Sequence, residues 1–133
     1  MDKAEANEYY GTNVFPAVPE DLRESEDQQL GIFRRDGGTG QIYWDGMAYN
    51  YANDDFSRTL SVAVEKDSLP LIDYAFYKAS EEKSLINGVE VAIGKTQDGW
   101  HYAQFTYRGA GFQLTASGLT DDEFAASAAS LIR

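Results

Sequence analysis

The chain has 133 residues, enough for one domain with a substantial core and too few for two. It carries 22 acidic and 11 basic side chains, a formal net charge of −11, and it contains no cysteine. A nucleic-acid binder needs a basic footprint that displaces counterions from phosphate, so nucleic acid is not expected as a partner. The lack of cysteine excludes disulfides, thiolate metal ligands and thiol catalysis. Since no apolar run approaches the length of a membrane span, direct membrane insertion by this segment is not expected.

Residues 1–13 are polar and charged, which predicts a flexible N-terminal linker ahead of a single α+β domain over residues 14–133. Within that domain, Pro16 and Pro19 hold the first apolar segment extended. Alternating apolar residues predict strands over residues 28–35, 41–44, 47–51 and 73–79. The alternation of Leu60, Val62 and Val64 also favours a strand, although Asp54 and Asp55 leave open a capped helix there.

The last fifty positions, 84–133, predict strands joined by tight turns and closed by a helix. Asn87-Gly88 is the favoured two-residue hairpin turn, between the short strand 84–86 and the strand 89–93. Strands over 100–107 and 112–115 follow. Thr120 and Glu123 form a capping box at the start of the helix, with a hydrophobic staple from Leu119 to Phe124. The fold class expected is therefore α+β: a curved, mostly antiparallel β-sheet of about six to eight strands with the C-terminal helix packed on one face.

Aromatic side chains are frequent, with nine Tyr, seven Phe and two Trp. A sheet covered by one helix has a second face, and rings exposed there would form a recognition surface. The residues assigned to this possible surface are Tyr43, Tyr49, Tyr51, Trp100 and Tyr102. The competing interpretation is that these rings fill the core and pair across strands.

No residue is assigned as catalytic, cofactor-binding or metal-binding. His101 is the only histidine, and spacing alone supplies no nucleophile for it. The acidic groups at 54–55 and 121–123 do not match the alternating carboxylates of a calcium loop. The glycine-rich stretch 36–40 lacks the lysine that ends a phosphate-binding loop, so it is expected to form a hairpin turn.

Several of these features recur together in one known family. An early proline-containing segment, the Asn87-Gly88 turn, a Trp100-containing strand, Gly111-Phe112 followed by Leu114, and the capped C-terminal helix resemble domain of unknown function 4367. The likeness is good over residues 84–133 and looser before them. Members lie at the extracytoplasmic C-termini of Gram-positive membrane proteins and lipoproteins, including anti-sigma-factor-like ones. The resemblance implies a domain displayed at the cell surface and tethered in the full-length protein.

The function expected from this resemblance is that of a non-enzymatic, extracytoplasmic binding or sensing module of a bacterial envelope protein. Its partner would be a protein or a cell-envelope ligand, and the domain would be a monomer. One alternative is a carrier that holds a lipid or other apolar ligand between sheet and helix. A second alternative is a hydrolytic enzyme, which would need convergent polar groups in a cleft.

Overall fold

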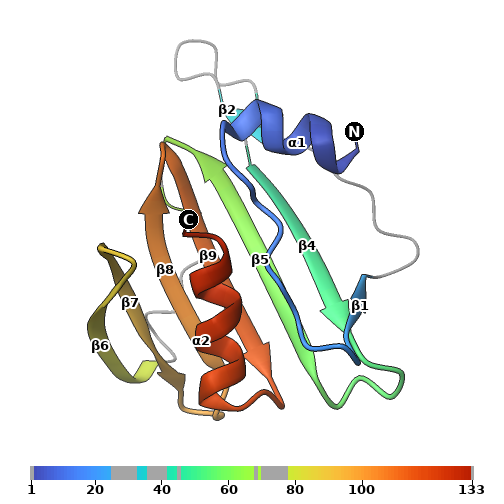
Figure 1. Ribbon diagram of the computed structural model, residues 1–133, viewed down its shortest axis with the longest axis vertical. Coiled ribbons are helices and arrows are strands. Elements are labelled where there is room, and N and C mark those ends of the chain that lie inside the picture. Colours follow the sequence, from blue (N-terminus) through green and yellow to red (C-terminus); the bar gives the residue numbers. More distant parts are fainter. Residues whose placement is uncertain are drawn as a thin grey trace.

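The computed structural model describes residues 2–24, 33–35, 42–44, 46–67, 69 and 78–132. These residues form a seven-stranded sheet, a separate two-stranded hairpin and two helices (Figure 1). The elements, in chain order, are α1 (Lys3–Tyr10), β1 (Arg23–Glu24), β2 (Phe33–Arg35), β3 (Ile42–Trp44), β4 (Gly46–Ala52), β5 (Thr59–Lys66), β6 (Lys78–Ile86), β7 (Val89–Thr96), β8 (His101–Tyr107), β9 (Ala110–Ser117) and α2 (Asp121–Ser130).

The large sheet has the strand order β1-β4-β5-β9-β8-β7-β6, and every neighbouring pair is antiparallel. The strands β5 and β9 lie side by side in its middle, with Val62 opposite Leu114. The expected curved antiparallel α+β fold is therefore confirmed, as is the strand preferred over residues 60–64. The separate hairpin pairs β2 with β3. The strand expected over 73–79 lies almost entirely outside the described residues, as does the first part of the strand expected over 28–35.

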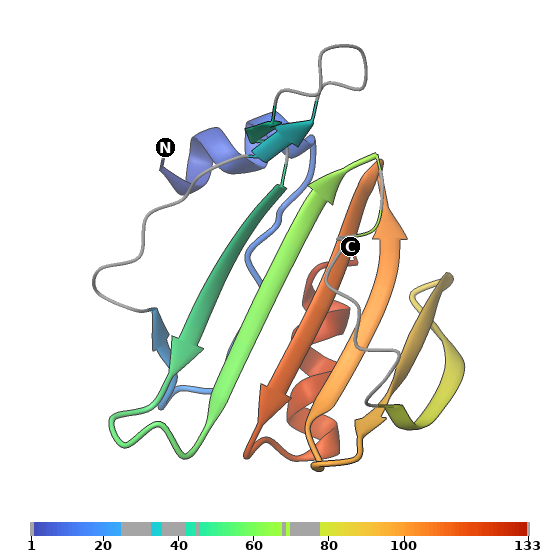
Figure 2. The same cartoon turned by 180° about the vertical axis from the view of Figure 1, so that it is seen from behind.

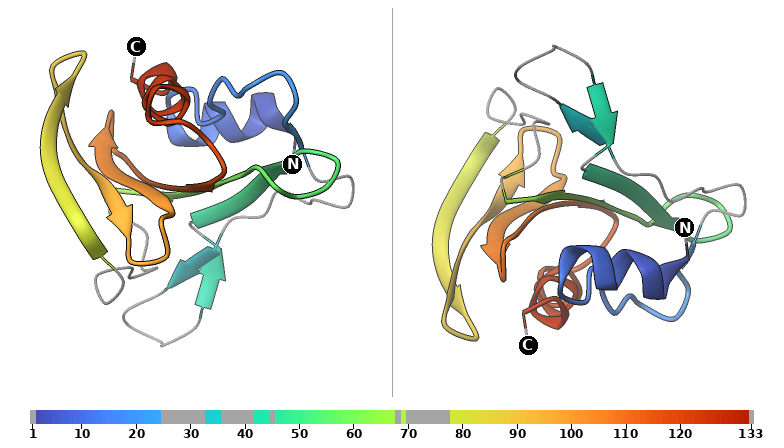
Figure 3. Two further views of the ribbon diagram at one scale, coloured as in Figure 1. Left: turned by 90° about the horizontal axis from the view of Figure 1, so that it is seen from below. Right: turned by 90° about the horizontal axis from the view of Figure 1, so that it is seen from above.

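Both helices cover the same, concave face of the sheet, and the β2–β3 hairpin lies on the opposite side (Figure 3). Seen from behind in Figure 2, the sheet stands in front of α2, with β7 and β6 at one edge and β4 and the short β1 at the other. Alternate strand residues point toward the helices and form the core. Its largest fully buried side chains include Tyr49, Leu60, Phe112, Leu114 and Phe124.

The N-terminal segment is part of this core, so the prediction of a flexible linker over residues 1–13 is corrected. Asp2 caps α1 by accepting from the Glu5 amide at 2.8 Å, and Gly11 ends the helix in the left-handed conformation. Ala6 and Tyr10 are buried against the sheet. Helix α1 and the segment that follows it thus cover the part of the sheet that α2 leaves free.

Helix α2 begins as its sequence predicts. The Thr120 hydroxyl accepts from the Glu123 amide at 3.1 Å, and the Glu123 carboxylate accepts from the Thr120 amide at 2.9 Å. Leu119 and Phe124, the two residues of the staple, are both buried. Phe124 and Ala128 pack onto the sheet together with Leu131 and Ile132, which closes the interior below the helix.

Candidate functional site

A cleft of about 650 Å³ opens between the first turns of α2 and the β6–β7 hairpin. The sheet curls at this end, so β6 and β7 rise beside the helix (Figure 3). Residues of α2 and of β6, β7 and β8 line the cleft: Ser80, Glu81, Glu82, Ser84, Ile86, Ile93, Gly94, Lys95, His101, Asp121, Asp122 and Ala125. We call it the acidic cleft, because four of these side chains are carboxylates and one is an ammonium.

Two contacts hold the walls of the acidic cleft together at opposite ends of α2. At the start of the helix, Lys95 Nζ lies 3.3 Å from Asp121 Oδ1. At its end, Asn87 Nδ2 donates to the Ile132 carbonyl at 2.6 Å. Asn87 and Gly88 both have positive φ, as expected for this turn, so the tip of the hairpin is anchored to the helix. The hairpin and the helix are therefore in contact on both sides of the cleft.

The charge of the acidic cleft is only partly neutralised from within. Its one lysine is already paired with Asp121. Glu82 and Asp122 are exposed, and neither forms an ion pair with any residue in the described part of the chain. Ile86 and Ile93 add apolar surface to the lining of the same cleft. The cleft thus combines unpaired negative charge with an apolar wall.

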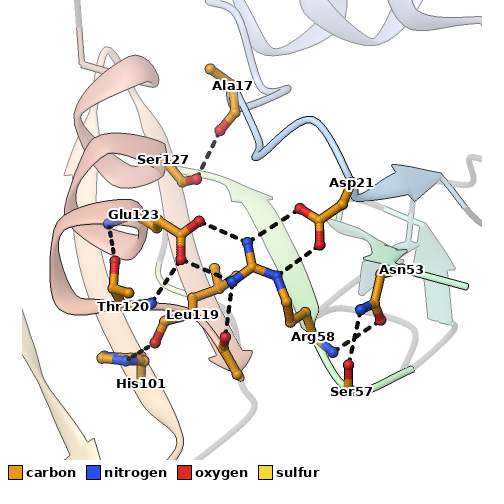
Figure 4. Close-up of polar contacts among 11 residues, drawn as sticks. Ala17, Asp21, Asn53, Ser57, Arg58, His101, Leu119, Thr120, Glu123 and Ser127 are labelled. Atoms are coloured by element: carbon orange, nitrogen blue, oxygen red, sulfur yellow. Dashed lines mark hydrogen bonds and ion pairs between the residues drawn. The ribbon is translucent and has the colours of Figure 1, made fainter. Parts of the chain in front are cut away.

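His101 lies at the inner end of the acidic cleft, only 7% exposed and stacked on Phe124. Its Nε2 lies 3.0 Å from the Leu119 carbonyl oxygen (Figure 4). A carbonyl only accepts, so Nε2 carries a hydrogen and donates it. The same Nε2 lies 3.7 Å from Asp121 Oδ1. Within the described ranges Nδ1 has no hydrogen-bond partner. His101 therefore connects β8 to the start of α2 at the inner end of the cleft.

An arginine positions the start of α2 and with it the acidic wall. The Arg58 guanidinium lies between Asp21 and Glu123, as Figure 4 shows. It also donates to the Gly118 carbonyl. Its nitrogens lie 2.7 Å from a Glu123 oxygen and 2.8 Å from an Asp21 oxygen. Hydrogen bonds from Arg58 are the main cause that lowers the pKa of Glu123 to about 2, and those to Glu123 and Asp21 raise the pKa of Arg58. This ion-pair network joins the residue before β5, the N-terminal segment and α2.

Gly94 allows the sheet to curl around the acidic cleft. A Cβ at this position would lie 2.0 Å from the Ser80 carbonyl oxygen, so only glycine permits the close approach of β6. The hydroxyl of Tyr102, from the strand on the other side of Gly94, donates to the same carbonyl at 2.9 Å. Burial, with a smaller contribution from Glu81, raises the pKa of Tyr102 to about 12. Tyr102 thus holds the curled strand in place.

The residues assigned to an aromatic recognition surface do not come together as one. Tyr49, Tyr51 and Tyr102 are buried, at 1%, 4% and 1% exposed, whereas Trp100 is 41% exposed. The Tyr43 side chain lies outside what the structure describes. For the three buried tyrosines, the assignment is corrected in favour of core packing.

Tyr49 and Tyr102 are buried for different physical reasons. Tyr49 donates its hydroxyl to the Val14 carbonyl, and its ring lies 5.0 Å from that of Phe15. The N-terminal segment therefore covers rings that a linker would have left open. Tyr102 instead points to the opposite face, where it contacts the β6 backbone.

The acidic cleft was not predicted from the sequence. As a site, the acidic group 121–123 was considered only as a calcium loop, and the residues of β6 carried no site assignment. The signal available was the density of charge in Glu81-Glu82 and in Asp121-Asp122, which the fold brings to facing walls. In the described part of the chain, no group of three or more His, Asp or Glu side chains is arranged to hold a metal ion. Neither described helix is long and apolar enough to cross a membrane.

Comparison with models of protein families, with curated proteins and with solved structures gives no match.

Proposed function

We propose that this chain is a non-enzymatic binding module that recognises positively charged groups in the acidic cleft. The observation that carries the proposal is a pair of carboxylates, Glu82 and Asp122, on facing walls of a cleft of about 650 Å³, neither of which has an ion-pair partner among the residues that the structure describes. Each carboxylate oxygen accepts hydrogen bonds, and a guanidinium or ammonium group supplies only donors. The chemistry of the walls thus matches a cationic ligand.

The apolar surface of the acidic cleft narrows the choice of ligand. Lysine and arginine carry three or four methylene groups below their charged ends, and these stems pack on apolar surface while the charge stays in a polar setting. Ile86, Ile93 and Ala125 offer such a surface next to the carboxylates. Arginine suits the site best because its planar group donates to two carboxylates at once.

The two alternatives have less support. An apolar carrier would need open space between sheet and helix, but Phe124, Ala128, Leu131 and Ile132 fill that interior and are at most 1% exposed. A hydrolase would need a base aligned with a nucleophile. The Nε2 atom of His101 is instead bonded to the Leu119 carbonyl.

The extracytoplasmic location and tethering implied by the resemblance to domain of unknown function 4367 remain part of the proposal. A displayed domain would meet basic proteins and cationic envelope components directly. Protease treatment of intact cells that make the protein tests this point. Loss of the intact domain without lysis supports display, and full protection of the domain with cleavage of a known surface protein contradicts it.

Binding is tested with a fluorescent short peptide in which Arg alternates with Thr, measured by anisotropy. We expect saturable binding that weakens as salt is raised, because exposed charges are screened over about 10 Å at 0.1 M salt. Each lost pair should raise the Kd about two- to fivefold, so the double variant Glu82→Gln/Asp122→Asn should raise it about four- to twenty-fivefold.

A matched control removes the same charge elsewhere. Glu8 on α1 and Glu65 on β5 do not line the acidic cleft, so Glu8→Gln/Glu65→Gln removes the same two negative charges and leaves the site intact. The control variant should bind within about twofold of the unaltered protein. Equal weakening in both double variants would mean that overall charge, and not the acidic cleft, attracts the peptide, which would contradict the proposal.

A further inference from the structure

We infer that the ligand of the acidic cleft is an extended polypeptide segment with basic side chains at alternate positions, which adds to the sheet as a strand along β6. This inference rests on the proposed function and specifies the form of the ligand. The protein would then recognise the backbone of the peptide as well as its positive charges.

The edge strand β6 offers a template for such pairing. It is nine residues long and is the last strand in the order of the sheet. On one side it pairs with β7 from Lys78 to Ile86, and no strand of the described ranges pairs with its other side. An edge of this kind presents backbone N–H and C=O groups that an added strand satisfies.

The side chains of β6 then select the sequence of the added strand. Ser80, Glu82 and Ser84 alternate along β6 and all line the acidic cleft. In a neighbouring strand every second side chain points to the same face, with Cβ atoms about 5 Å from those of its partners. An arginine or lysine at these positions therefore lies next to Glu82 and extends over the cleft toward Asp122.

Pairing of β6 with a second copy of itself is disfavoured by the same charges. An antiparallel pair centred on Glu82 would place two Glu82 side chains directly opposite each other, and like charges in that position are destabilising. The nearest basic residue, Lys83, is already paired with Glu90 at 3.2 Å. A basic strand from another polypeptide has no such conflict and is the occupant that fits.

Backbone N-methylation of the Arg–Thr peptide tests this inference. In one version the backbone nitrogen of every Arg is methylated, and in the other the backbone nitrogen of every Thr. The side chains and charges of the peptide therefore do not change. Successive residues of a strand direct their N–H groups to opposite edges, so strand addition makes the two versions differ. We expect one version to lose affinity by at least about tenfold and the other to stay within about twofold of the parent peptide.

A second readout locates the contact. Amide hydrogen exchange within residues 78–86 should slow when the parent peptide binds, because the outer N–H groups of β6 become bonded. Equal affinity of both methylated versions, with no slowing over 78–86, would overturn strand addition while leaving cation binding in the acidic cleft intact. Failure of the unmethylated peptide to bind would overturn both.

Discussion

Lys95 on β7 and Asp121 at the start of α2 form an ion pair across one end of the acidic cleft, with 3.3 Å between Nζ and Oδ1. Both side chains are largely exposed, so the pair contributes little to folding stability. Its main effect is on the site, where it supplies the one positive side chain among the carboxylates.

Replacing Lys95 should therefore improve binding of the Arg–Thr peptide. We expect Lys95→Met to tighten the Kd by about two- to fivefold, because it removes a competing cation and keeps an unbranched apolar stem. Lys3→Met is the matched control, since Lys3 is an exposed lysine paired with Glu24 away from the cleft. The same tightening in both variants, measured by anisotropy, would show that net charge alone sets the affinity.

The Arg58–Glu123 pair should make stability depend on acid pH. The folded protein holds the pKa of Glu123 at about 2, below its ordinary value of 4.5. A lowered pKa gives stability that is present above pH 4.5 and is lost as the pH falls toward 2. Glu123→Gln should thus lower Tm at pH 6 and match the unaltered protein near pH 2. A difference in Tm that stays constant over this range contradicts the assignment; Glu65→Gln serves as control.

The hydroxyl of Tyr102 should stabilise the curl of β6. Tyr102→Phe keeps the ring but leaves the Ser80 carbonyl without this donor, so we expect a loss of about 1 kcal/mol in the free energy of unfolding. Gly94→Ala should cost more, because its Cβ would collide with the same carbonyl. Urea unfolding measures both losses. Unchanged stability in Gly94→Ala would show that the two strands do not approach as described.

The burial of α1 is tested by one substitution at two sites in the same helix. Ala6 is fully buried and Ala4 is exposed. Ala6→Asp should cost at least about 2 kcal/mol because it buries a charge, whereas Ala4→Asp should stay within about 1 kcal/mol. Urea denaturation separates the two, and equal small effects would restore the interpretation of residues 1–13 as a linker.

Local signals were sufficient for much of the fold. The Thr120–Glu123 capping box and the Asn87-Gly88 turn each specify their own geometry within a few residues, and both were predicted. Helix α1 was missed because it is only eight residues long and buries just Ala6 and Tyr10. Its caps, Asp2 and Gly11, were the signals that would have found it.

The acidic cleft could not be predicted in the same way, because it is formed by segments that are distant in the sequence. Glu82 and Asp122 are forty positions apart, and only the curl of the sheet at Gly94 and the docking of α2 place them on facing walls. The burial of Tyr49 likewise depends on a segment thirty-five positions earlier in the chain, which supplies the Val14 carbonyl. Neither relationship has a periodic signature in the sequence.

The central claim, that the acidic cleft binds a cationic side chain, is tested most directly by an NMR titration of the labelled protein with Nα-acetyl-arginine amide. We expect saturable amide shifts concentrated in residues 80–86, 93–95 and 121–125, and no comparable shifts with Nα-acetyl-glutamine amide. Shifts spread over other surfaces, or equal shifts with the uncharged glutamine compound, would contradict it.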